Sequence, residues 1–271
     1  MAHVMAVLNT THHKYTIEKY GLETQLFWKF LISWIFLTLI FYKNIWFEKN
    51  IHSFISILMI AVTSLIVTIF ANKLLKDVSI QKFVAIMMLN MPITYIIDLV
   101  LKNREFSFIA VMGILLIIVT NYKVVYQPLK EEKSENFFES TSPIFIILFV
   151  GISRTVFINH GINQQYFSQA FVNYLFFGVI FLFAAFFYRK KIMFSKKIIS
   201  TYSLQSIFNV GLNFAIIQVM SYSVFLPSII AAISNMITVL ISRYSLKNNL
   251  LNLEKIGIIT GTVGVLLIIF S

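Results

Sequence analysis

Polar side chains recur at one-turn intervals inside apolar stretches that are long enough to cross a membrane. Gln205, Asn209 and Asn213 follow one another at i, i+4 and i+8, and Tyr202 precedes them by about one turn. On a helix this spacing places all four on one face. Unpaired polar groups are costly in hydrocarbon, so this face is expected to line a cavity that binds a small polar ligand. The alternative interpretation is hydrogen bonding between helices.

Two further polar lines occupy corresponding places in two other apolar stretches. Asn90 and Thr94 lie one turn apart in the first stretch, and Asn235 and Thr238 are their counterparts in the second. We expect the two lines to face each other and to contribute to the same substrate site. Pro92 lacks a backbone donor, which favours a kink and leaves a carbonyl free for a ligand.

Asp98 continues the first of these lines and is a carboxylate well inside a predicted span. A carrier driven by protons needs a titratable group whose charge changes with access, so Asp98 is a candidate for proton coupling. Lys102 lies four residues further on, and an ion pair between the two at the membrane interface is the alternative.

Three other places carry polar or charged residues inside or beside predicted spans. Gln169 and Asn173 stand one turn apart at the start of an apolar stretch and are expected to line an entrance. Arg154 lies toward the end of its predicted span. It is interpreted as reaching the lipid headgroups, and attraction of an anionic substrate is the alternative. Lys29 lies near a helix start and is interpreted in the same way.

The composition requires lipid as the solvent of these elements. Of 271 residues, 58% are hydrophobic and only 12% are charged, and the mean hydropathy is +0.83. Apolar windows of about 20 residues predict helices that cross the membrane. The sequence therefore predicts an all-α, polytopic membrane helical bundle. Its nine predicted spans are residues 26–42, 53–71, 83–101, 106–120, 143–159, 171–188, 198–220, 223–242 and 256–270.

Several classes of site and partner are disfavoured. The chain has no cysteine, and its histidines are scattered, so we expect no metal site and no cofactor. The net charge of +11 comes from lysines and arginines dispersed at helix ends, which indicates membrane orientation and argues against nucleic acid. With nine spans and the N-terminus inside, the distribution of positive charge favours an external C-terminus.

An internal duplication sets the expected domain organisation. Asn90-Met91 is followed ten residues later by Leu101-Lys102-Asn103, and the same order recurs at Asn235-Met236 and Leu246-Lys247-Asn248. Repeats of this kind are typical of secondary transporters. We expect a first transmembrane repeat over residues 1–120, a polar linker over 121–141 and a second repeat over 142–271.

The segment from residue 74 to 119 resembles the third-to-fifth-helix block of the drug/metabolite transporter superfamily in its EamA-type form. It has a turn, a helix with a central proline, a short polar hairpin and a glycine-started helix. Residues 21–42 are similar to the second helix of that family. The resemblance implies ten helices in two inverted five-helix repeats, with both termini in the cytoplasm. The first helix has to lie in residues 1–20, where charged and histidine residues make it short or truncated.

These observations together predict a carrier. We expect a secondary transporter, and specifically an exporter, of small polar or amphiphilic metabolites or drugs that works by alternating access. Its partners are the substrate and membrane lipids, as a monomer or homodimer in a bacterial plasma membrane. The alternatives are a non-transporting membrane scaffold or immunity-type protein and a lipid-modifying membrane enzyme. No catalytic set of acids, histidines or nucleophiles is recognisable, so an enzyme is not expected.

Overall fold

The computed structural model describes residues 15–77, 83, 86–101, 105–131, 137–227, 229–230, 260–261 and 263–268. Its elements within these ranges are helices, which confirms the all-α polytopic class. The two 3-10 turns are η1 (Tyr42–Asn44) and η2 (Arg189–Lys191). The α-helices are α2 (Leu22–Phe41), α3 (Ile51–Asp77), α5 (Asn90–Val100), α6 (Phe108–Glu131), α7 (Phe137–Asn163), α8 (Gln169–Phe187) and α9 (Lys196–Met220).

Five of the described helices are long and apolar enough to cross a membrane, judged by length and composition. These candidate spans are Leu22–Asn44, Ile51–Lys76, Ile144–Asn163, Gln169–Phe187 and Lys196–Met220. Two shorter apolar helices cover Ile86–Val100 and Phe108–Val119. The predicted span at 223–242 lies largely outside the described residues, and the span at 256–270 is described at 260–261 and 263–268. The total of nine or ten spans therefore stays a prediction.

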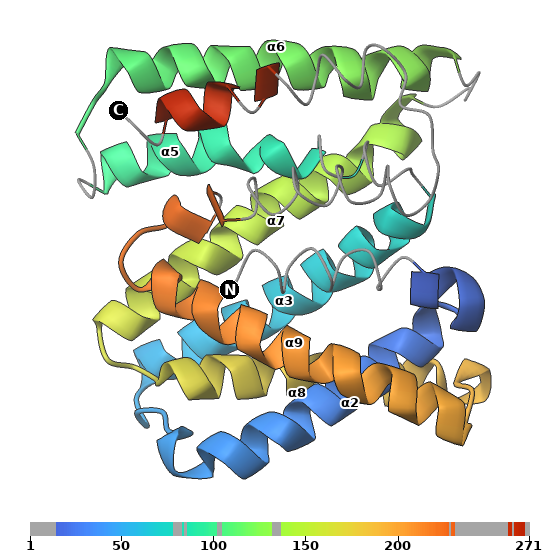
Figure 1. Ribbon diagram of the computed structural model, residues 1–271. Helices are drawn as coiled ribbons and strands as arrows, with labels where there is room; N and C mark the ends of the chain where they lie inside the picture. Colours follow the sequence, from blue (N-terminus) through green and yellow to red (C-terminus); the bar gives the residue numbers. More distant parts are fainter. Residues whose placement is uncertain are drawn as a thin grey trace.

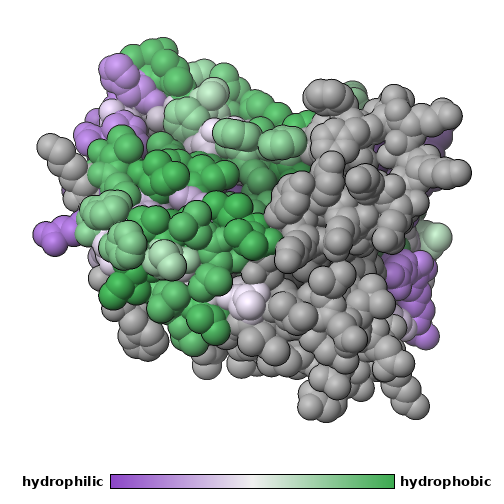
Figure 2. Space-filling model, turned by 90° about the horizontal axis from the view of Figure 1, so that it is seen from above, coloured by the Kyte–Doolittle hydropathy of each residue, from purple (hydrophilic) through white to green (hydrophobic). Residues whose placement is uncertain are grey.

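The polarity of the bundle is inverted with respect to a protein folded in water. Large apolar side chains such as Leu39, Phe54 and Phe186 point outward, with exposed fractions of 70%, 62% and 82%. Polar residues such as Gln25 and Asn173 have no exposed surface at all. Figure 2 shows hydrophobic side chains covering much of the described part of one face. This pattern is expected where lipid is the solvent.

The helices pack in an order that brings both halves of the chain together (Figure 1). Helices α2, α8 and α9 pack on one another at one end of the bundle, and α3 packs along α7 across its middle. At the other end, α5 and α6 lie side by side. The loop before α3 is tied to the loop before α8 by backbone hydrogen bonds from Glu48 to Tyr166 (2.7 Å) and from Ser168 to Trp46 (3.1 Å).

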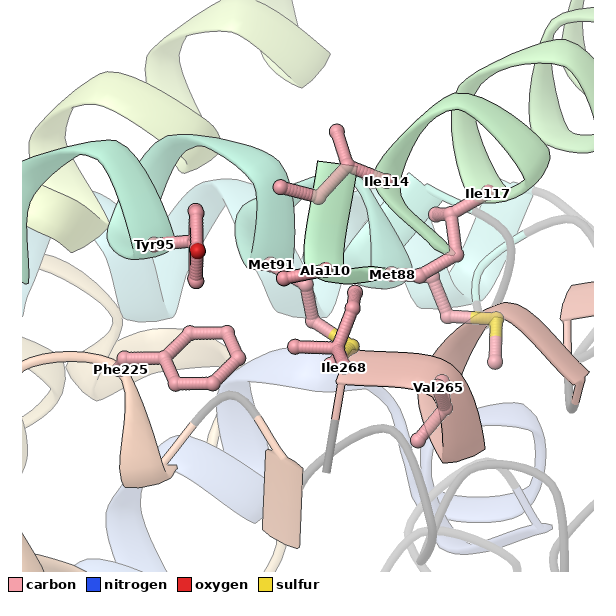
Figure 3. Close-up of a cluster of buried hydrophobic side chains, with 9 residues drawn as sticks. All are labelled: Met88, Met91, Tyr95, Ala110, Ile114, Ile117, Phe225, Val265 and Ile268. Carbon is pink, nitrogen blue, oxygen red and sulfur yellow. The ribbon is translucent and has the colours of Figure 1, made fainter. Parts of the chain in front are cut away.

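Residues 263–268, here called the C-terminal segment, pack against α5 and α6. Val265 and Ile268 lie in one buried cluster with Met91 and Tyr95 of α5, and Phe225 closes the cluster from the segment that follows α9. Figure 3 shows these side chains gathered between the helices. The C-terminal segment therefore covers an apolar face that α5 and α6 would otherwise expose.

The described part of the predicted linker is mostly helical. The polar composition of residues 121–141 suggested a solvated loop, but α6 continues to Glu131 and α7 begins at Phe137. The segment still joins the two predicted repeats. The flanking spans can propagate a helix into this segment, although strong helix formers such as Lys123, Gln127 and Leu129 are a minority of its residues.

The end of the expected first helix is part of the structure. Residues 15–20 are helical, and Thr16 and Ile17 are buried. Gly21 separates this helix from α2 with a φ of +83°, a conformation that favours glycine. A single glycine therefore separates the two helices, without a longer loop.

Candidate cavity between the two halves

A cavity of about 200 Å³ lies among α3, α5, α7 and α9. Helices from both predicted repeats therefore form its wall. Most of the wall is apolar and includes Val67, Met87, Ile147, Ile152, Ile216 and Met220. Drug-sized ligands usually occupy pockets of roughly 300–1,000 Å³, so this cavity suits a smaller molecule.

Asn90 and Thr94 of α5 line this cavity, and both were predicted as substrate contacts. The amide oxygen of Asn90 is buried and has no hydrogen-bond partner. The hydroxyl of Thr94 donates to the backbone oxygens of Asn90 (2.9 Å) and Met91 (3.2 Å). The expected kink near Pro92 takes the form of a turn at Leu89, because proline cannot donate to the carbonyl one turn earlier.

Two residues of α7, Arg154 and Thr155, supply further polar groups to the cavity. The Thr155 hydroxyl donates to the backbone oxygen of Gly151 (3.0 Å). The guanidinium carbon of Arg154 lies 5.2 Å from the centre of the Phe176 ring on α8, within the range of a cation–π contact.

The interpretation of Arg154 as a headgroup contact is wrong. The span of α7 runs from Ile144 to Asn163, so Arg154 stands near its middle. Each end of the span is about 14 Å away along the helix axis at 1.5 Å per residue. The predicted span ended at residue 159, which made Arg154 look closer to the interface than it is.

The amide line on α9 faces α2 and is not part of the described cavity wall. Tyr202, Gln205 and Asn209 are all buried, with at most 3% of each residue exposed. The Asn209 amide donates to the Ser33 hydroxyl of α2 (3.1 Å). Asn213 in turn donates to the amide oxygen of Asn209 (3.1 Å). These contacts are bonds between helices and within α9, and a role in substrate binding stays a prediction.

Sequence reasoning missed the partner of this line on α2. Gln25, Lys29 and Ser33 are spaced at i, i+4 and i+8 and are all buried. The Lys29 residue is 2% exposed, so its interpretation as a headgroup contact is wrong. The backbone oxygen of Lys29 accepts from Ser206 of α9 (2.9 Å). The same spacing rule that identified the α9 line would have found this one.

Some polar atoms at this α2–α9 contact have no partner. The amide nitrogen of Gln25 and both amide atoms of Gln205 are buried without a hydrogen bond. Buried polar groups are nearly always paired with protein or with water.

The other predicted site residues fall at separate places. Asn173 is fully buried on α8 and donates to the backbone oxygen of Gln169 (3.1 Å). The two residues are therefore bonded to each other, and their place at an entrance stays a prediction. Asn235 and Thr238 lie outside the described residues.

Asp98 binds the segment that follows α9. Its carboxylate accepts hydrogen bonds from the Ser223 hydroxyl and from the backbone nitrogens of Val224 (3.0 Å) and Phe225 (3.2 Å). Ser223 itself accepts from the nitrogen of Leu226 (3.1 Å), where a new helical turn begins. A carboxylate is favourable at a helix N-terminus. This network gives Asp98 a structural role, while proton coupling stays a prediction. Lys102 lies outside the described residues.

The described residues offer no metal centre, since no three His, Cys, Asp or Glu side chains gather among them as ligands would. The polar groups of the cavity are amide, hydroxyl and guanidinium groups. Such groups bind a ligand through hydrogen bonds and charge.

The model of the EamA-like transporter family matches residues 1–126. These residues, which are less than half of the chain, are similar to that family. The match includes both segments whose resemblance was noted from the sequence, residues 21–42 and 74–119, and confirms that resemblance. No curated protein matches the chain. The EamA-like part contains α2, α3 and α5, so it supplies two of the four helices around the cavity. A transporter of the drug/metabolite type is the class of protein that this match indicates.

Proposed function

We propose that this protein is a secondary transporter that exports small polar or amphiphilic metabolites through the cavity among α3, α5, α7 and α9. The observation that carries the proposal is the shared wall, with α3 and α5 from the EamA-like part and α7 and α9 from the rest. A site between two repeats is where secondary transporters bind their substrates.

Alternating access is the proposed mechanism. The first predicted repeat carries Asn90 and Thr94, and the second carries Arg154 and Thr155. A relative rocking of the repeats would open the cavity to one side of the membrane at a time. The substrate would be held by polar groups from both repeats and shielded by the apolar wall, and a volume of about 200 Å³ favours a metabolite over a drug.

The alternatives are less well supported by the same observations. A scaffold or immunity-type protein has no need for a cavity between two repeats, whereas a carrier requires one. An enzyme requires a positioned acid, base or nucleophile. The polar groups that line the described cavity are Asn90, Thr94, Arg154 and Thr155. They form a binding set without a nucleophile–base pair.

We further propose that the protein lies in the cell membrane of a bacterium and interacts with its substrate and with membrane lipids. The apolar outer surface of the described helices supports a membrane location.

A pair of tryptophan variants on α7 tests this proposal. Thr155→Trp places a large ring in the cavity, while Ser153→Trp places the same ring on the exposed face of the same helix. Transport is measured as exchange of a labelled metabolite mixture in liposomes that contain the purified protein.

We expect the Ser153→Trp variant to transport like the unmodified protein and the Thr155→Trp variant to lose transport. Equal transport by both variants would show that the transport path does not run through this cavity. If the unmodified protein exchanges no more metabolite than protein-free liposomes do, this result would contradict the proposed transport function.

A further inference from the structure

Arg154 is a charged residue without a charged partner in the part of the chain that the structure describes. Its Nε is buried and makes no hydrogen bond, and its observed contact is with the face of Phe176. Among the described residues that line the cavity, it is also the one that carries a charge. The described wall therefore carries a positive charge, and no acidic side chain stands among the described residues that line it.

A cation in this position is costly for the empty protein. Arg154 stands in the middle of the α7 span, where a charged side chain is unfavourable unless it meets a partner or water. Phe176 offsets only part of this cost, because a ring face is a weaker partner for a guanidinium than a carboxylate or phosphate. Intramembrane charges that are retained despite their cost usually mark a substrate path.

A guanidinium also restricts the kind of ligand. It presents several N–H donors in a planar fork that matches the paired oxygens of a carboxylate or phosphate. Asn90 offers an amide oxygen without a partner in the same cavity, and this oxygen can accept from a ligand hydroxyl or ammonium group. The remaining wall is apolar and suits a short hydrocarbon part.

We propose that the transported substrate is a small organic anion whose carboxylate or phosphate group binds the guanidinium of Arg154, while a hydrogen-bond donor of the same molecule meets Asn90. This inference rests on the proposed transport function and names the substrate class of the same cavity. Arg154 is then a substrate-binding residue, and the unbalanced charge of the empty cavity is neutralised by the ligand.

The test compares Arg154→Gln and Arg154→Lys with a matched control, Arg189→Gln. Arg189 lies in the exposed turn η2, away from the cavity, so its substitution removes the same charge without touching the site. Liposomes with each protein are offered three sets of labelled probes: small carboxylates, small phosphate esters, and neutral or cationic metabolites of similar size.

We expect the unmodified protein and the Arg189→Gln variant to accumulate one of the two anionic sets. Arg154→Gln should lower that accumulation about tenfold to a hundredfold, as expected for loss of a charge-assisted contact. Arg154→Lys should retain an intermediate rate, because lysine keeps the charge but not the fork. The two anionic sets distinguish a carboxylate from a phosphate as the bound group.

A second measurement separates substrate binding from a structural role. Removal of a buried charge that lacks a partner should leave the thermal stability of the empty protein unchanged or raised. A lower melting temperature for Arg154→Gln would overturn the proposal, because it would show that the guanidinium supports the fold.

Two transport outcomes would also overturn it, and they differ in what else they contradict. Accumulation of neutral or cationic probes alone would contradict the anionic substrate and leave the transport function in place. If no probe accumulates above the level in protein-free liposomes, this result would contradict both the anionic substrate and the transport function.

Discussion

Gly113 of α6 and Gly264 of the C-terminal segment face each other across a backbone contact. A Cβ added to Gly113 would lie 2.5 Å from the carbonyl oxygen of Gly264, and one added to Gly264 would lie 2.7 Å from that of Gly113. The neighbours match too, with Ile268 against Gly113 and Ile117 against Gly264. The two glycines therefore allow a close approach of α6 and the C-terminal segment.

Gly113→Ala should destabilise the protein, because the new methyl group would meet backbone that cannot move away alone. We expect a loss of about 1–3 kcal/mol, the usual effect of overpacking. Gly151→Ala is the matched control, since its Cβ would lie 3.8 Å from the Val67 side chain, an ordinary contact. The free energy of unfolding of both variants is measured in detergent, and equal values would exclude the close approach of α6 and the C-terminal segment.

Asp98→Asn should lower stability, because a neutral amide replaces the carboxylate that accepts from Ser223, Val224 and Phe225. The expected loss is about 2 kcal/mol, typical of hydrogen bonds to a charged group. Glu105→Gln removes an acidic charge at an exposed position and should have little effect. Thermal unfolding of the two variants gives the comparison.

The same Asp98→Asn variant also tests proton coupling. A transport rate that loses its pH dependence while the melting temperature stays unchanged would favour the coupling role over the structural one. A lower melting temperature with an unchanged pH profile would favour the structural role.

Asn90→Leu and Asn209→Leu should affect different properties, the first transport and the second stability. Asn90 lines the cavity, so its replacement should lower transport while the protein stays folded. Asn209 joins α9 to Ser33 of α2, so its replacement should lower stability by about 0.6 kcal/mol, the average for a hydrogen bond between membrane helices. Metabolite exchange in liposomes and unfolding in detergent measure the two effects.

A double-mutant cycle of Ser33→Ala and Asn209→Ala separates this bond from other effects of each change. Additive losses would show that the two residues do not interact. Abolished transport by Asn209→Leu at unchanged stability would instead assign the α9 amide line to the substrate path.

The helices and their polar faces were predictable from the sequence, because apolar length and a period of about 3.6 residues are local properties. Which helices pack against each other was not predictable. The period places Asn209 on a particular face of α9, but its contact with Ser33 depends on how two distant helices pack. The link between Asp98 and Ser223 is likewise a tertiary contact. Only the structure shows that Asn90 and Arg154 line the same cavity.

Errors in span boundaries had larger effects than errors in helix assignment. Extension of α7 to Asn163 changes Arg154 from an interfacial residue to a central one. Lys29 was misjudged for a different reason, since it does lie near the start of α2. Its burial follows from the packing of α2 on α8 and α9, which a hydropathy profile does not contain.

The outward-facing leucine and phenylalanine side chains also determine what a stability measurement on this protein means. Each helix satisfies its own backbone hydrogen bonds, so separation of the bundle in an amphiphile leaves the individual helices intact. Free energies obtained under these conditions describe helix association and not helix formation. Circular dichroism alone would miss the dissociated state, and a probe of distance between helices is the appropriate signal.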